Sequence, residues 1–427
     1  MQKSILNRTV FCRDNIEVLR GMDSNSIDLI YLDPPFNKKR NFHAPIGSQA
    51  EGASFKDIWY EEDTKDEWIG LIADQLPVLH DYLQGIEKIG DASNKYYLVY
   101  MSIRLLELKR ILKDTGSIYL HCDETMGHYL KLLMDCIFGD DFFRNEIIWH
   151  YSGWNKRLKH SFESRHDKIY FYGKSSKQQF NGYFHPLKSK EDYVRLRKQK
   201  LHTDDDGREF VYSDGGGGKR VKRYIDEVLA TGIATDDLWE IDKLNNSSKE
   251  NTKYPTQKPL ALLERIIAAS SNEGDRILDP FCGCATTLIA AEKLHRQWIG
   301  IDISPKAFDL VKLRLGREVG DSQDLLKRQN ALIFREDIPE RTDLVRSPAT
   351  KTEVKHSLYG KQKGHCNGCD ILFEYRHLTI DHILPRAKGG QDNPENLQLL
   401  CNSCNSIKSD NDMAYLRIKL REYGILR

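Results

Sequence analysis

A buried strand that ends in an acid, two prolines and an aromatic residue constrains the fold of this chain more than any other feature. The run IDLIYLDPPFN, Ile27 to Asn37, begins with the apolar pattern of a strand buried on both faces. Pro34 and Pro35 then supply no backbone N–H groups, so regular pairing cannot continue through them. The run predicts either an ordinary rigid turn or a turn that holds Asp33 and Phe36 still for chemistry.

Strand and helix patterns alternate in two separate stretches of the chain. In the first, the strand SIDLIYLD precedes a helix whose apolar residues, from Leu98 to Leu112, recur every three or four positions. The triplet Asp114-Thr115-Gly116 is expected to stop that helix before the strand SIYLHCD and the helix GHYLKLLMDCIFG. From Tyr254 the segments PTQKPLALLERIIAAS, DRILD, ATTLIAAEKLH and QWIGID read as helix, strand, helix and strand. This alternation predicts an α/β fold with a parallel sheet and crossover helices.

The length of 427 residues suggests two or three domains, at roughly 150 residues each. We place one α/β half at 1–150, an inserted region at 151–250, a second α/β half at 251–320, a linker at 321–353 and a cysteine-bearing module at 354–427. No apolar run reaches the ~18 residues needed to cross a bilayer, so we expect no membrane partner. The N-terminus lacks the pattern of a signal peptide, which predicts a cytoplasmic location.

The inserted region carries a local excess of positive charge, although the whole chain has a net charge of only +1. From Tyr151 to Arg223 there are 18 Lys and Arg against 9 Asp and Glu, interleaved with aromatic residues such as Trp154 and Phe162. A solvated charged surface and a phosphate-binding surface would share this composition. Both interpretations stay open on composition alone.

A second strand end carries another acid followed by small residues. The stretch RILDPFCGCATTL places Asp279 at a strand end, and Phe281, Gly283 and Thr286 in the loop that starts the next helix. Ligands of doubly wound sheets bind at such loops. Roughly twenty residues later, Asp302 ends the next strand, where an acid can bind the hydroxyl pair of a ribose. An ordinary strand-to-helix turn is the alternative, because the loop has few glycines.

Four of the nine cysteines form two tight pairs near the C-terminus. Cys366-x-x-Cys369 and Cys401-x-x-Cys404 are separated by 31 residues, as in two zinc knuckles that share one metal ion. Four thiolates fill the tetrahedral shell of Zn²⁺, so the predicted site is structural. A redox pair is the alternative, but it needs a different surrounding fold.

The two strand ends together resemble the amino-directed DNA methyltransferases, which use S-adenosylmethionine. The motif order is CRD at Cys12 to Asp14, DPPF, the segment ending in YLHCD, SRHDKIYFYGKS, the basic region, PTQKP and DPFCG. This order is similar to that of the beta class, over roughly residues 5–320. The resemblance implies a Rossmann-like S-adenosylmethionine-dependent methyltransferase fold, with a target-recognition region inserted at 151–250.

The resemblance also assigns roles to individual residues. Asp33 and the backbone carbonyl of Pro34 would accept hydrogen bonds from the target amino group, and Phe36 would stack on a base flipped out of the duplex. Pro34 and Pro35 would keep that turn rigid. The expected cofactor contacts are Asp302 at the ribose, Asp14 near the adenine ring, Asp279, Phe281, Gly283 and Thr286 along the pocket, and Thr256 and Lys258 at the methionine end.

The residue before the two prolines favours adenine as the target base. The cytosine-amino enzymes of the family commonly have serine there, whereas this chain has Asp33. Cytosine N4 is the alternative target, and RNA is a further one because related catalytic loops can serve RNA. The expected partner is double-stranded DNA, while the recognised sequence and a homodimer are left open.

The segment between the cysteine pairs resembles the HNH nucleases, whose small ββα-metal domain holds a divalent ion beside a histidine. By position, His382 would activate water, and Asp381 with Asn405 would bind Mg²⁺ or a similar ion. Asn396 would fix the loop that orients His382. Many members have histidine where Asn405 stands, and an amide oxygen favours hard metal ions. Outside this pattern, His382 would be read as a structural histidine.

The two resemblances together predict a single-chain restriction-modification protein. Its methyltransferase would mark a DNA site, and its zinc-bound HNH nuclease would cut DNA that lacks the mark. The alternative is an orphan methyltransferase whose zinc module only binds DNA.

Overall fold

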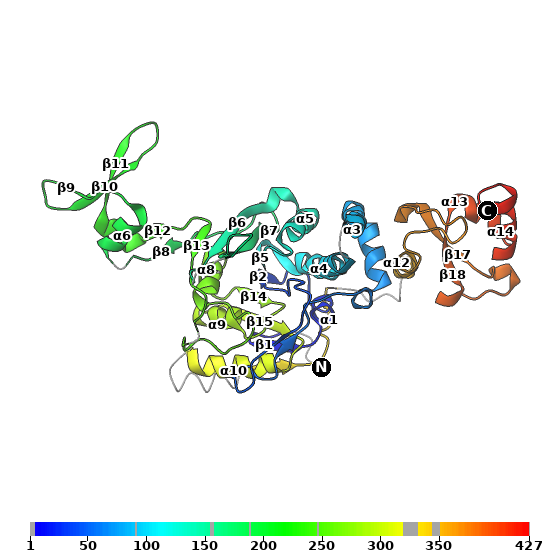
Figure 1. Ribbon diagram of the computed structural model, residues 1–427, viewed down its shortest axis with the longest axis horizontal. Helices are drawn as coiled ribbons and strands as arrows, with labels where there is room; N and C mark the ends of the chain where they lie inside the picture. The colour runs from blue at the N-terminus through cyan, green and yellow to red at the C-terminus, as the bar shows by residue number, and fades with distance from the viewer. Residues whose placement is uncertain are drawn as a thin grey trace.

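A nine-stranded mixed sheet forms the centre of the protein (Figure 1). The structure is a computed structural model and describes residues 5–89, 92–153, 158–187, 189–245, 247–318, 332–343 and 351–426. In spatial order the strands are β13 (Leu238–Glu240), β6 (Phe143–His150), β7 (His166–Gly173), β5 (Leu112–Cys122), β2 (Ile27–Leu32), β14 (Arg276–Asp279), β15 (Gln297–Asp302), β1 (Thr9–Cys12) and β16 (Ile333–Arg335). The strands from β5 to β16 are parallel, and β7 is antiparallel to both of its neighbours.

Parallel pairing brings four strand ends to one edge of this sheet. Ile277 of β14 pairs with Leu29 of β2, and β14 pairs on its other side with β15. Asp302, the last residue of β15, pairs with Cys12 of β1. Because parallel strands point the same way, the loops that follow β1, β2, β14 and β15 leave the sheet side by side.

Helices cover both faces of the sheet, because its apolar strands have no face to leave in water. One face packs against α1 (Asn15–Arg20), α2 (Asp66–Gln75), α3 (Pro77–Ile89), α4 (Ala92–Ile111) and α5 (Gly127–Phe138), with η1 (Glu61–Asp63) and η2 (Asp140–Phe142) beside α4 and α5. The other face packs against α8 (Leu260–Ser270), α9 (Thr286–Lys293) and α10 (Lys306–Glu318). The predicted α/β class is confirmed. No helix in the described ranges is both long enough and apolar enough to span a bilayer.

The first half differs from the prediction at the junction between its long helix and the next strand. The helix α4 ends at Ile111 and β5 begins at Leu112, so the triplet 114–116 lies inside a strand and is not a separate stop. Leu112 pairs with Ile27, and the register between β2 and β5 then shifts before Leu29. This early pairing with β2 is what extends the strand back to the end of the helix, a long-range contact that local turn propensity cannot report.

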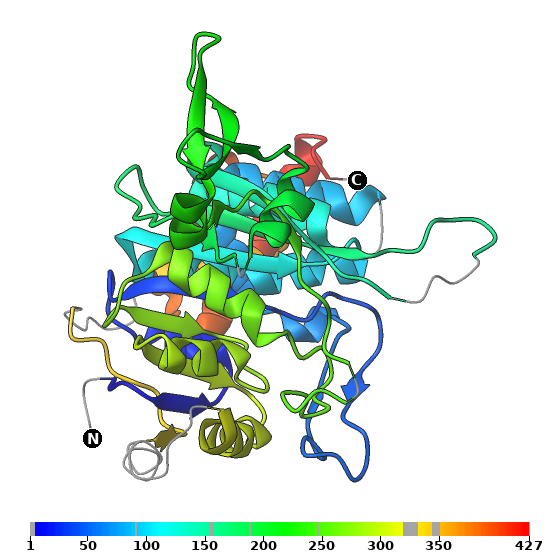
Figure 2. The ribbon, with the colours of Figure 1, turned by 90° about the vertical axis from the view of Figure 1, so that its left-hand side faces the viewer.

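Between β7 and β13 the chain leaves the sheet and builds a separate lobe that projects from one end of the molecule (Figures 1 and 2). The lobe contains β8 (Phe184–His185), α6 (Lys190–Arg197), β9 (His202–Thr203), β10 (Glu209–Asp214), β11 (Arg220–Tyr224), α7 (Ile225–Thr231) and β12 (Ile233–Ala234). Its small core includes Tyr193, Val211 and Val228. The limits of the predicted inserted region, 151–250, stay a prediction, and that range also supplies β7 and β13 to the central sheet.

The predicted linker, 321–353, contributes to the sheet where it is described. Its residues Ile333–Arg335 form β16, which pairs in parallel with β1. Residues 319–331 and 344–350 lie outside the described residues. For those two stretches the linker stays a prediction.

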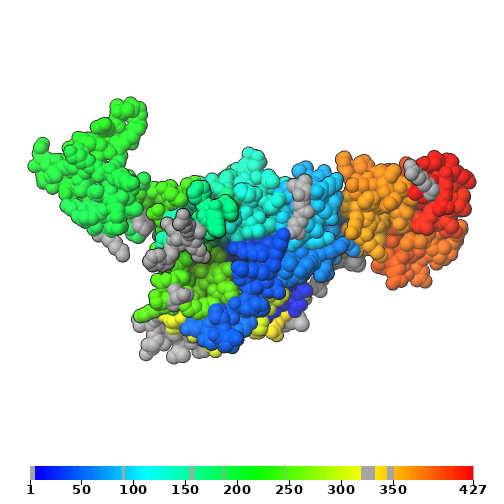
Figure 3. All heavy atoms as spheres, viewed as in Figure 1, coloured from blue at the N-terminus to red at the C-terminus, as the bar shows by residue number. Residues whose placement is uncertain are grey.

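A compact module stands at the end of the molecule opposite the lobe (Figures 1 and 3). After α12 (Lys351–Lys361), the strands β17 (Leu378–His382) and β18 (Leu397–Cys401) pair antiparallel and lead into α13 (Asn402–Lys408) and α14 (Met413–Glu422). Short turns at η3 (Tyr375–His377), η4 (Arg386–Lys388) and η5 (Pro394–Asn396) connect them. Leucines of β17, β18 and α14 form its core with the four paired cysteines. The predicted ββα arrangement is confirmed.

Two glycines let this module dock closely on the sheet domain. A Cβ at Gly70 of α2 would lie 2.1 Å from the carbonyl oxygen of His356 on α12, and a Cβ at Gly360 would lie 2.0 Å from that of Asp66. Only glycine fits at such a helix crossing, because any side chain would meet backbone. His356 also hydrogen-bonds Asp74 through Nε2, at 2.9 Å. The module is therefore packed against α2 as well as connected by the chain.

We expect Gly360→Ala to weaken this docking, because the added methyl group has no space against the backbone of α2. Overpacking of this kind costs about 1–3 kcal/mol, which a thermal melt and the protease sensitivity of residues 351–427 would report. Gly85→Ala on α3 is the matched control, since nothing lies within 4 Å of its Cβ position. Alanine there should be neutral or stabilising by up to about 1 kcal/mol. Equal behaviour of the two variants would contradict the close crossing.

Candidate functional site

One cavity of about 340 Å³ lies at the edge of the sheet where β1, β2, β14 and β15 end. Its lining includes all the residues that the sequence assigned to methyl transfer and to the cofactor: Asp14, Asp33, Pro34, Pro35, Phe36, Thr256, Lys258, Asp279, Phe281, Gly283, Thr286 and Asp302. These residues lie far apart in the chain, so parallel pairing brings them together. Their individual roles stay predictions.

The loop after β14 is held by the acid at the end of β15. The backbone N–H of Gly283 donates to Oδ2 of Asp302 at 2.8 Å, and that of Ser304 donates to Oδ1 at 2.8 Å. Gly283 has φ +47°, and a Cβ there would lie 3.0 Å from the ring of Tyr254. A glycine is therefore needed both for the backbone conformation and for the close approach of Tyr254.

Six aspartates line this one cavity, against four cationic side chains, so the acids are in excess: Asp14, Asp33, Asp57, Asp63, Asp279 and Asp302, with Arg13, Lys38, Lys56 and Lys258. Burial raises the pKa of Asp279 to about 7, although hydrogen bonds from Thr287 (2.5 Å) and the Phe281 N–H (3.0 Å) oppose the shift; the charges of Asp33 and Asp302 add to it. Burial also raises the pKa of Asp302. Crowded carboxylates are stabilised by a cation, so the cavity favours a positively charged ligand.

The carboxylate of Asp33, just after β2, has a partner at only one of its two oxygens. Nζ of Lys258, a buried side chain, forms an ion pair with Oδ2 of Asp33. Lys258 also donates to the carbonyl oxygen of Thr256 at 3.2 Å. The other oxygen of Asp33, Oδ1, is buried and has no hydrogen-bond partner among the described residues. A buried acceptor without a donor is unfavourable, so Oδ1 is the place for a ligand N–H group.

The aromatic ring of the same turn rests on a fixed histidine. Phe36 stacks on His121, with ring centroids 6.1 Å apart and an interplanar angle of 27°. His121 is fully buried and is hydrogen-bonded at both ring nitrogens, to the hydroxyl of Tyr31 (2.9 Å) and to Asp167 (3.3 Å). Burial acts to raise the pKa of Asp167, but the bond to His121 and nearby lysines hold it below its ordinary value. The ring of Phe36 therefore has a well-defined support.

A second acid anchors the backbone just after Phe36. Asp57 follows the hairpin of β3 (Phe42–His43) and β4 (Ser54–Phe55), and its carboxylate accepts from the N–H groups of Asn37 (2.5 Å) and Lys38 (3.1 Å). Asp57 is 1% exposed, and burial raises its pKa to about 6 against these bonds. The DPPF turn is thus held from both sides.

The cofactor side of the cavity contains residues that sequence reasoning missed. Arg104 of α4 is fully buried and donates to Asp14 at 2.6 Å, and its guanidinium lies 5.7 Å from the ring of Trp68 on α2. Trp68 and Tyr254 line the cavity. Arg104 interrupts an apolar helix face, which was the one available signal. His121 belongs to the segment ending in YLHCD, and Tyr254 directly precedes PTQKP, but neither motif gave these residues a role. Asp57 and Trp68 stand in no motif, so nothing local marked them.

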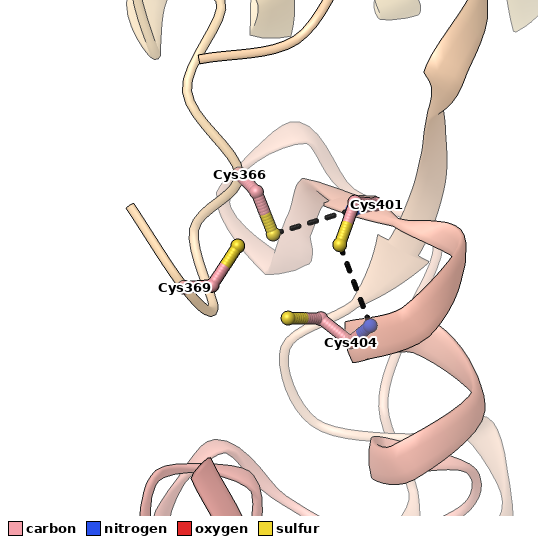
Figure 4. Close-up of side chains that lie close together, drawn as sticks. All are labelled: Cys366, Cys369, Cys401 and Cys404. Atoms are coloured by element: carbon pink, nitrogen blue, oxygen red, sulfur yellow. Dashed lines mark hydrogen bonds between the residues drawn. The ribbon is translucent and has the colours of Figure 1, made fainter. Parts of the chain in front are cut away.

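The four paired cysteines converge on one point (Figure 4). Their Sγ atoms all lie within 4.8 Å of one another, and all four side chains are buried. Backbone N–H groups of Gly368 (3.3 Å) and Cys401 (3.2 Å) donate to Sγ of Cys366, and that of Cys404 donates to Cys401 (3.4 Å). Four thiols with Zn–S bonds of about 2.3 Å would enclose a tetrahedral zinc ion, so the donor set fits zinc.

His382 ends β17 at the surface of the module and is oriented by its surroundings. Its Nε2 hydrogen-bonds Oδ1 of Asp392 at 2.6 Å. Asn396 bridges the intervening loop: it accepts from the N–H of Leu384 (2.9 Å) and donates to the carbonyl oxygens of Leu384 (3.1 Å) and Gln391 (2.9 Å). This places Asn396 where it can shape the loop beside His382, and its role stays a prediction.

The neighbouring Asp381 lies in a polar cluster between β17 and α13. Lys408 of α13 is buried and contacts Oδ2 of Asp381 at 3.1 Å, and Gln398 donates to the same oxygen at 2.8 Å. Asn405, one turn earlier on α13, donates to Thr379 at 3.3 Å, which leaves its carbonyl oxygen for another partner. The carboxylate and amide oxygens are hard donors that suit Mg²⁺.

Comparison with known protein families matches two parts of the chain. The model described as DNA methylase matches residues 27–313, and the model described as HNH endonuclease matches residues 366–411. The Type II methyltransferase M.HpaI of Haemophilus parainfluenzae is 26% identical over 313 residues, covering 73% of this chain and 76% of that protein. The DNA adenine methyltransferase YhdJ of Escherichia coli (strain K12) is 24% identical, covering 73% and 82%.

Other similar proteins share shorter stretches or only a distant likeness. The Type II methyltransferase M.EcaI of Enterobacter cloacae is 32% identical over 253 residues, covering 49% of this chain and 55% of that protein. The solved PvuII DNA methyltransferase (cytosine-N4-specific) is 14% identical, with a TM-score of 0.44, covering 78% of this chain and 96% of that one.

We expect the affinity of this cavity for S-adenosylmethionine, the cofactor that the sequence resemblance predicts, to rise between pH 6 and pH 8. Asp279, with its pKa raised to about 7, is mostly neutral at the lower pH and mostly ionised at the higher, and only the ionised form attracts the sulfonium cation. The dissociation constant, measured by calorimetry, should fall by up to about ten-fold over this range.

Asp279→Asn is the control for that measurement, because it keeps the shape of the side chain and removes its titration. Any titration of the cofactor itself changes the affinities of the wild type and of the variant equally. The variant should therefore show a flatter pH profile, and an equally steep one would reject Asp279 as the source.

Proposed function

We propose that this chain, which belongs to the DNA methylase family and carries an HNH endonuclease domain, methylates the exocyclic amino group of adenine in duplex DNA. The observation that carries the proposal is the shared cavity: Asp33 and Phe36 of one strand end face the acidic loops of two others. S-adenosylmethionine is the proposed methyl donor. Its cationic sulfonium suits an electronegative cavity.

The proposed chemistry explains the geometry around Asp33. An amino nitrogen conjugated with a base ring is a poor nucleophile, and a hydrogen bond to a fixed acceptor makes its lone pair more available. Lys258 holds Oδ2 of Asp33 and leaves the buried Oδ1 to accept that hydrogen bond. S-adenosylmethionine, when bound, would supply the methyl group that replaces one amino proton, and that proton would pass to the solvent while Asp33 holds the nitrogen in place. Phe36, supported by His121, would stack on the flipped base.

The remaining cavity residues would hold the cofactor. Asp302 would bind its ribose, Asp14 would lie near its adenine ring, and Asp279, Phe281, Gly283 and Thr286 would line the pocket, with Thr256 and Lys258 towards the methionine end. When bound, the cofactor supplies an already activated methyl group, so the protein's own contribution is mainly positioning.

Adenine is the proposed base because Asp33, and not serine, precedes the two prolines. The similarity to a protein named DNA adenine methyltransferase points the same way. Cytosine N4 is the alternative, since its amino group presents the same chemistry to the acceptor. RNA is a third and weaker alternative.

Asp33→Ala should abolish methyl transfer while leaving S-adenosylmethionine bound, because it removes the acceptor and not the cofactor loops. We expect a loss of about 10²-fold or more in transfer of labelled methyl groups to plasmid DNA. Digestion of the wild-type product to nucleosides would identify N6-methyladenine or N4-methylcytosine, with duplex RNA as a parallel substrate. A variant with full activity would remove Asp33 from the mechanism.

We propose that the C-terminal module cleaves DNA that the methyltransferase has not marked. Asp381 and Asn405 would hold Mg²⁺ or a similar ion, which would supply charge stabilisation for the scissile phosphate. His382, oriented by Asp392, would take a proton from the attacking water. Cys366, Cys369, Cys401 and Cys404 would hold a structural zinc ion. One chain would then perform both modification and restriction.

His382→Ala should abolish Mg²⁺-dependent cleavage of unmethylated DNA and leave methyl transfer unchanged. His377→Ala is the matched control, because the side chain of this exposed histidine accepts one hydrogen bond, from the neighbouring Arg376 at 3.2 Å, among the described residues. Premethylated DNA should resist the wild-type protein. If the wild type cuts neither DNA, the module only binds DNA; if it cuts both equally, methylation does not protect.

A further inference from the structure

A two-stranded ribbon extends from the lobe at the end of the molecule opposite the HNH module (Figures 1 and 2). Its strands, β10 and β11, are antiparallel, with Tyr212 opposite Lys222 and Asp214 opposite Arg220. The tip is a run of glycines, and Gly216 to Gly218 all have positive φ. The turn is closed by a hydrogen bond from the N–H of Gly215 to the carbonyl oxygen of Lys219, at 2.7 Å.

The base of the ribbon is anchored and its outer half is free of the lobe. Val211 is 1% exposed and packs into the lobe core with Tyr193 and Val228. Further out, no residue from Ser213 to Arg223 is buried, and Tyr212 and Val221 expose 40% and 51% of their surface. The ribbon is therefore held rigidly at one end and presents both of its faces at the other.

The outer strand is strongly basic. Lys219, Arg220, Lys222 and Arg223 occupy four of five consecutive positions, and none of them forms an ion pair among the described residues. Cations at the base of the lobe behave differently: Arg208 pairs with Asp226 at 2.7 Å, and Lys190 pairs with Glu209 at 2.9 Å. Lys222 does contact an aromatic ring, that of Phe210, whose centroid lies 4.4 Å from its Nζ. Adjacent cations without ion-pair partners repel one another, and an external polyanion would relieve that repulsion.

Shape decides which polyanion fits. The major groove of B-form DNA is about 12 Å wide and admits a two-stranded ribbon, whereas the major groove of an RNA duplex is too deep and narrow for side chains to read. Arginine and lysine side chains bind phosphates and guanine edges, and an exposed apolar side chain can contact the methyl group of thymine. The ribbon combines these residue types on one narrow element.

We propose that the β10–β11 ribbon enters the major groove of duplex DNA, with Arg220, Lys222 and Arg223 on phosphates and guanine edges and Tyr212 and Val221 against base edges. This rests on the proposed function, because it takes duplex DNA as the substrate. It assigns target recognition to one ribbon within the broad inserted region. The lobe core would act as the support that fixes the ribbon's direction.

The test measures binding of the full-length chain to a short mixed-sequence DNA duplex over a range of salt concentrations. Arg220→Ala, Lys222→Ala and Arg223→Ala should each weaken binding, and each lost phosphate contact should lower the slope of log affinity against log salt by about 0.9. Arg195→Ala is the control: this arginine of α6 is 77% exposed but already pairs with Asp192 at 2.9 Å. It should leave affinity and slope close to those of the wild type.

A second measurement separates base recognition from simple charge attraction. Tyr212→Ala and Val221→Ala remove no charge, so they should leave the salt slope unchanged and alter the sequence context of methylated bases, mapped by sequencing DNA from expressing cells. S-adenosylmethionine binding checks that every variant is folded. Because these side chains lie outside the lobe core, cofactor binding should be unaffected.

Three outcomes would overturn the proposal. In the first, the basic variants match Arg195→Ala while the wild type still methylates DNA, which places recognition elsewhere in the chain. In the second, an RNA duplex competes better than DNA and the ribbon variants lose that competition, which makes RNA the partner. In the third, the apolar variants leave the methylated context unchanged, which reduces the ribbon to a charge contact. A wild type that methylates no nucleic acid would instead reject the proposed function itself.

Discussion

The parallel pairing of β2 with β14 is the interaction on which the rest of the structure depends. Leu29 and Ile30 of β2 pair with Ile277 and Leu278 of β14, and all four side chains are fully buried. Because side chains alternate between the faces of a sheet, a slip of one residue would turn each apolar set to the wrong face. Burial thus sets the register, and the register places the loops of the two strands side by side at one cavity.

Charge balance within that cavity follows from the same arrangement. Carboxylates removed from water are unfavourable unless they are paired or hydrogen-bonded, and in this cavity each has its own partner. Lys258 pairs with Asp33, Arg104 pairs with Asp14, and backbone N–H groups hold Asp302. One acceptor, Oδ1 of Asp33, is left without a donor. Among the described aspartates paired or bonded in this way, the unpartnered oxygen is thus the one to which a substrate amino group is proposed to bind.

The helix α2 contacts both the candidate methyl-transfer cavity and the helix that leads into the HNH module. Trp68 on this helix lines the cavity, while Gly70 and Asp74 contact α12, which leads into the HNH module. The module is consequently seated on a helix of the methyltransferase core. From the sequence, the charged segment before the last domain predicts a linker that would leave the module loosely attached. The structure shows instead that the module is docked closely, through the packing of two helices that each contribute a glycine.

Local sequence patterns predicted much of this protein. Apolar runs, helix periodicity and turn residues located the strands on either side of the cavity, and their motifs named the residues that line it. The patterns failed where a distant segment decided the outcome. The triplet 114–116 became part of a strand because β2 pairs with the residues on either side of it, Leu112 and Ser117. Asp57, which stands in no motif, and His121, whose motif gave it no role, support the DPPF turn.

The sequence by itself therefore determined the kinds of chemistry available: an acid and an aromatic residue on a proline-stiffened turn, a small-residue loop, and two cysteine pairs around a histidine. The tertiary structure alone decided which groups meet. It pairs Lys258 with Asp33, stacks His121 on Phe36, and extends a basic β-ribbon beyond the lobe core. The physical reason is that contacts between distant segments depend on strand register and helix packing, which no short stretch of sequence encodes.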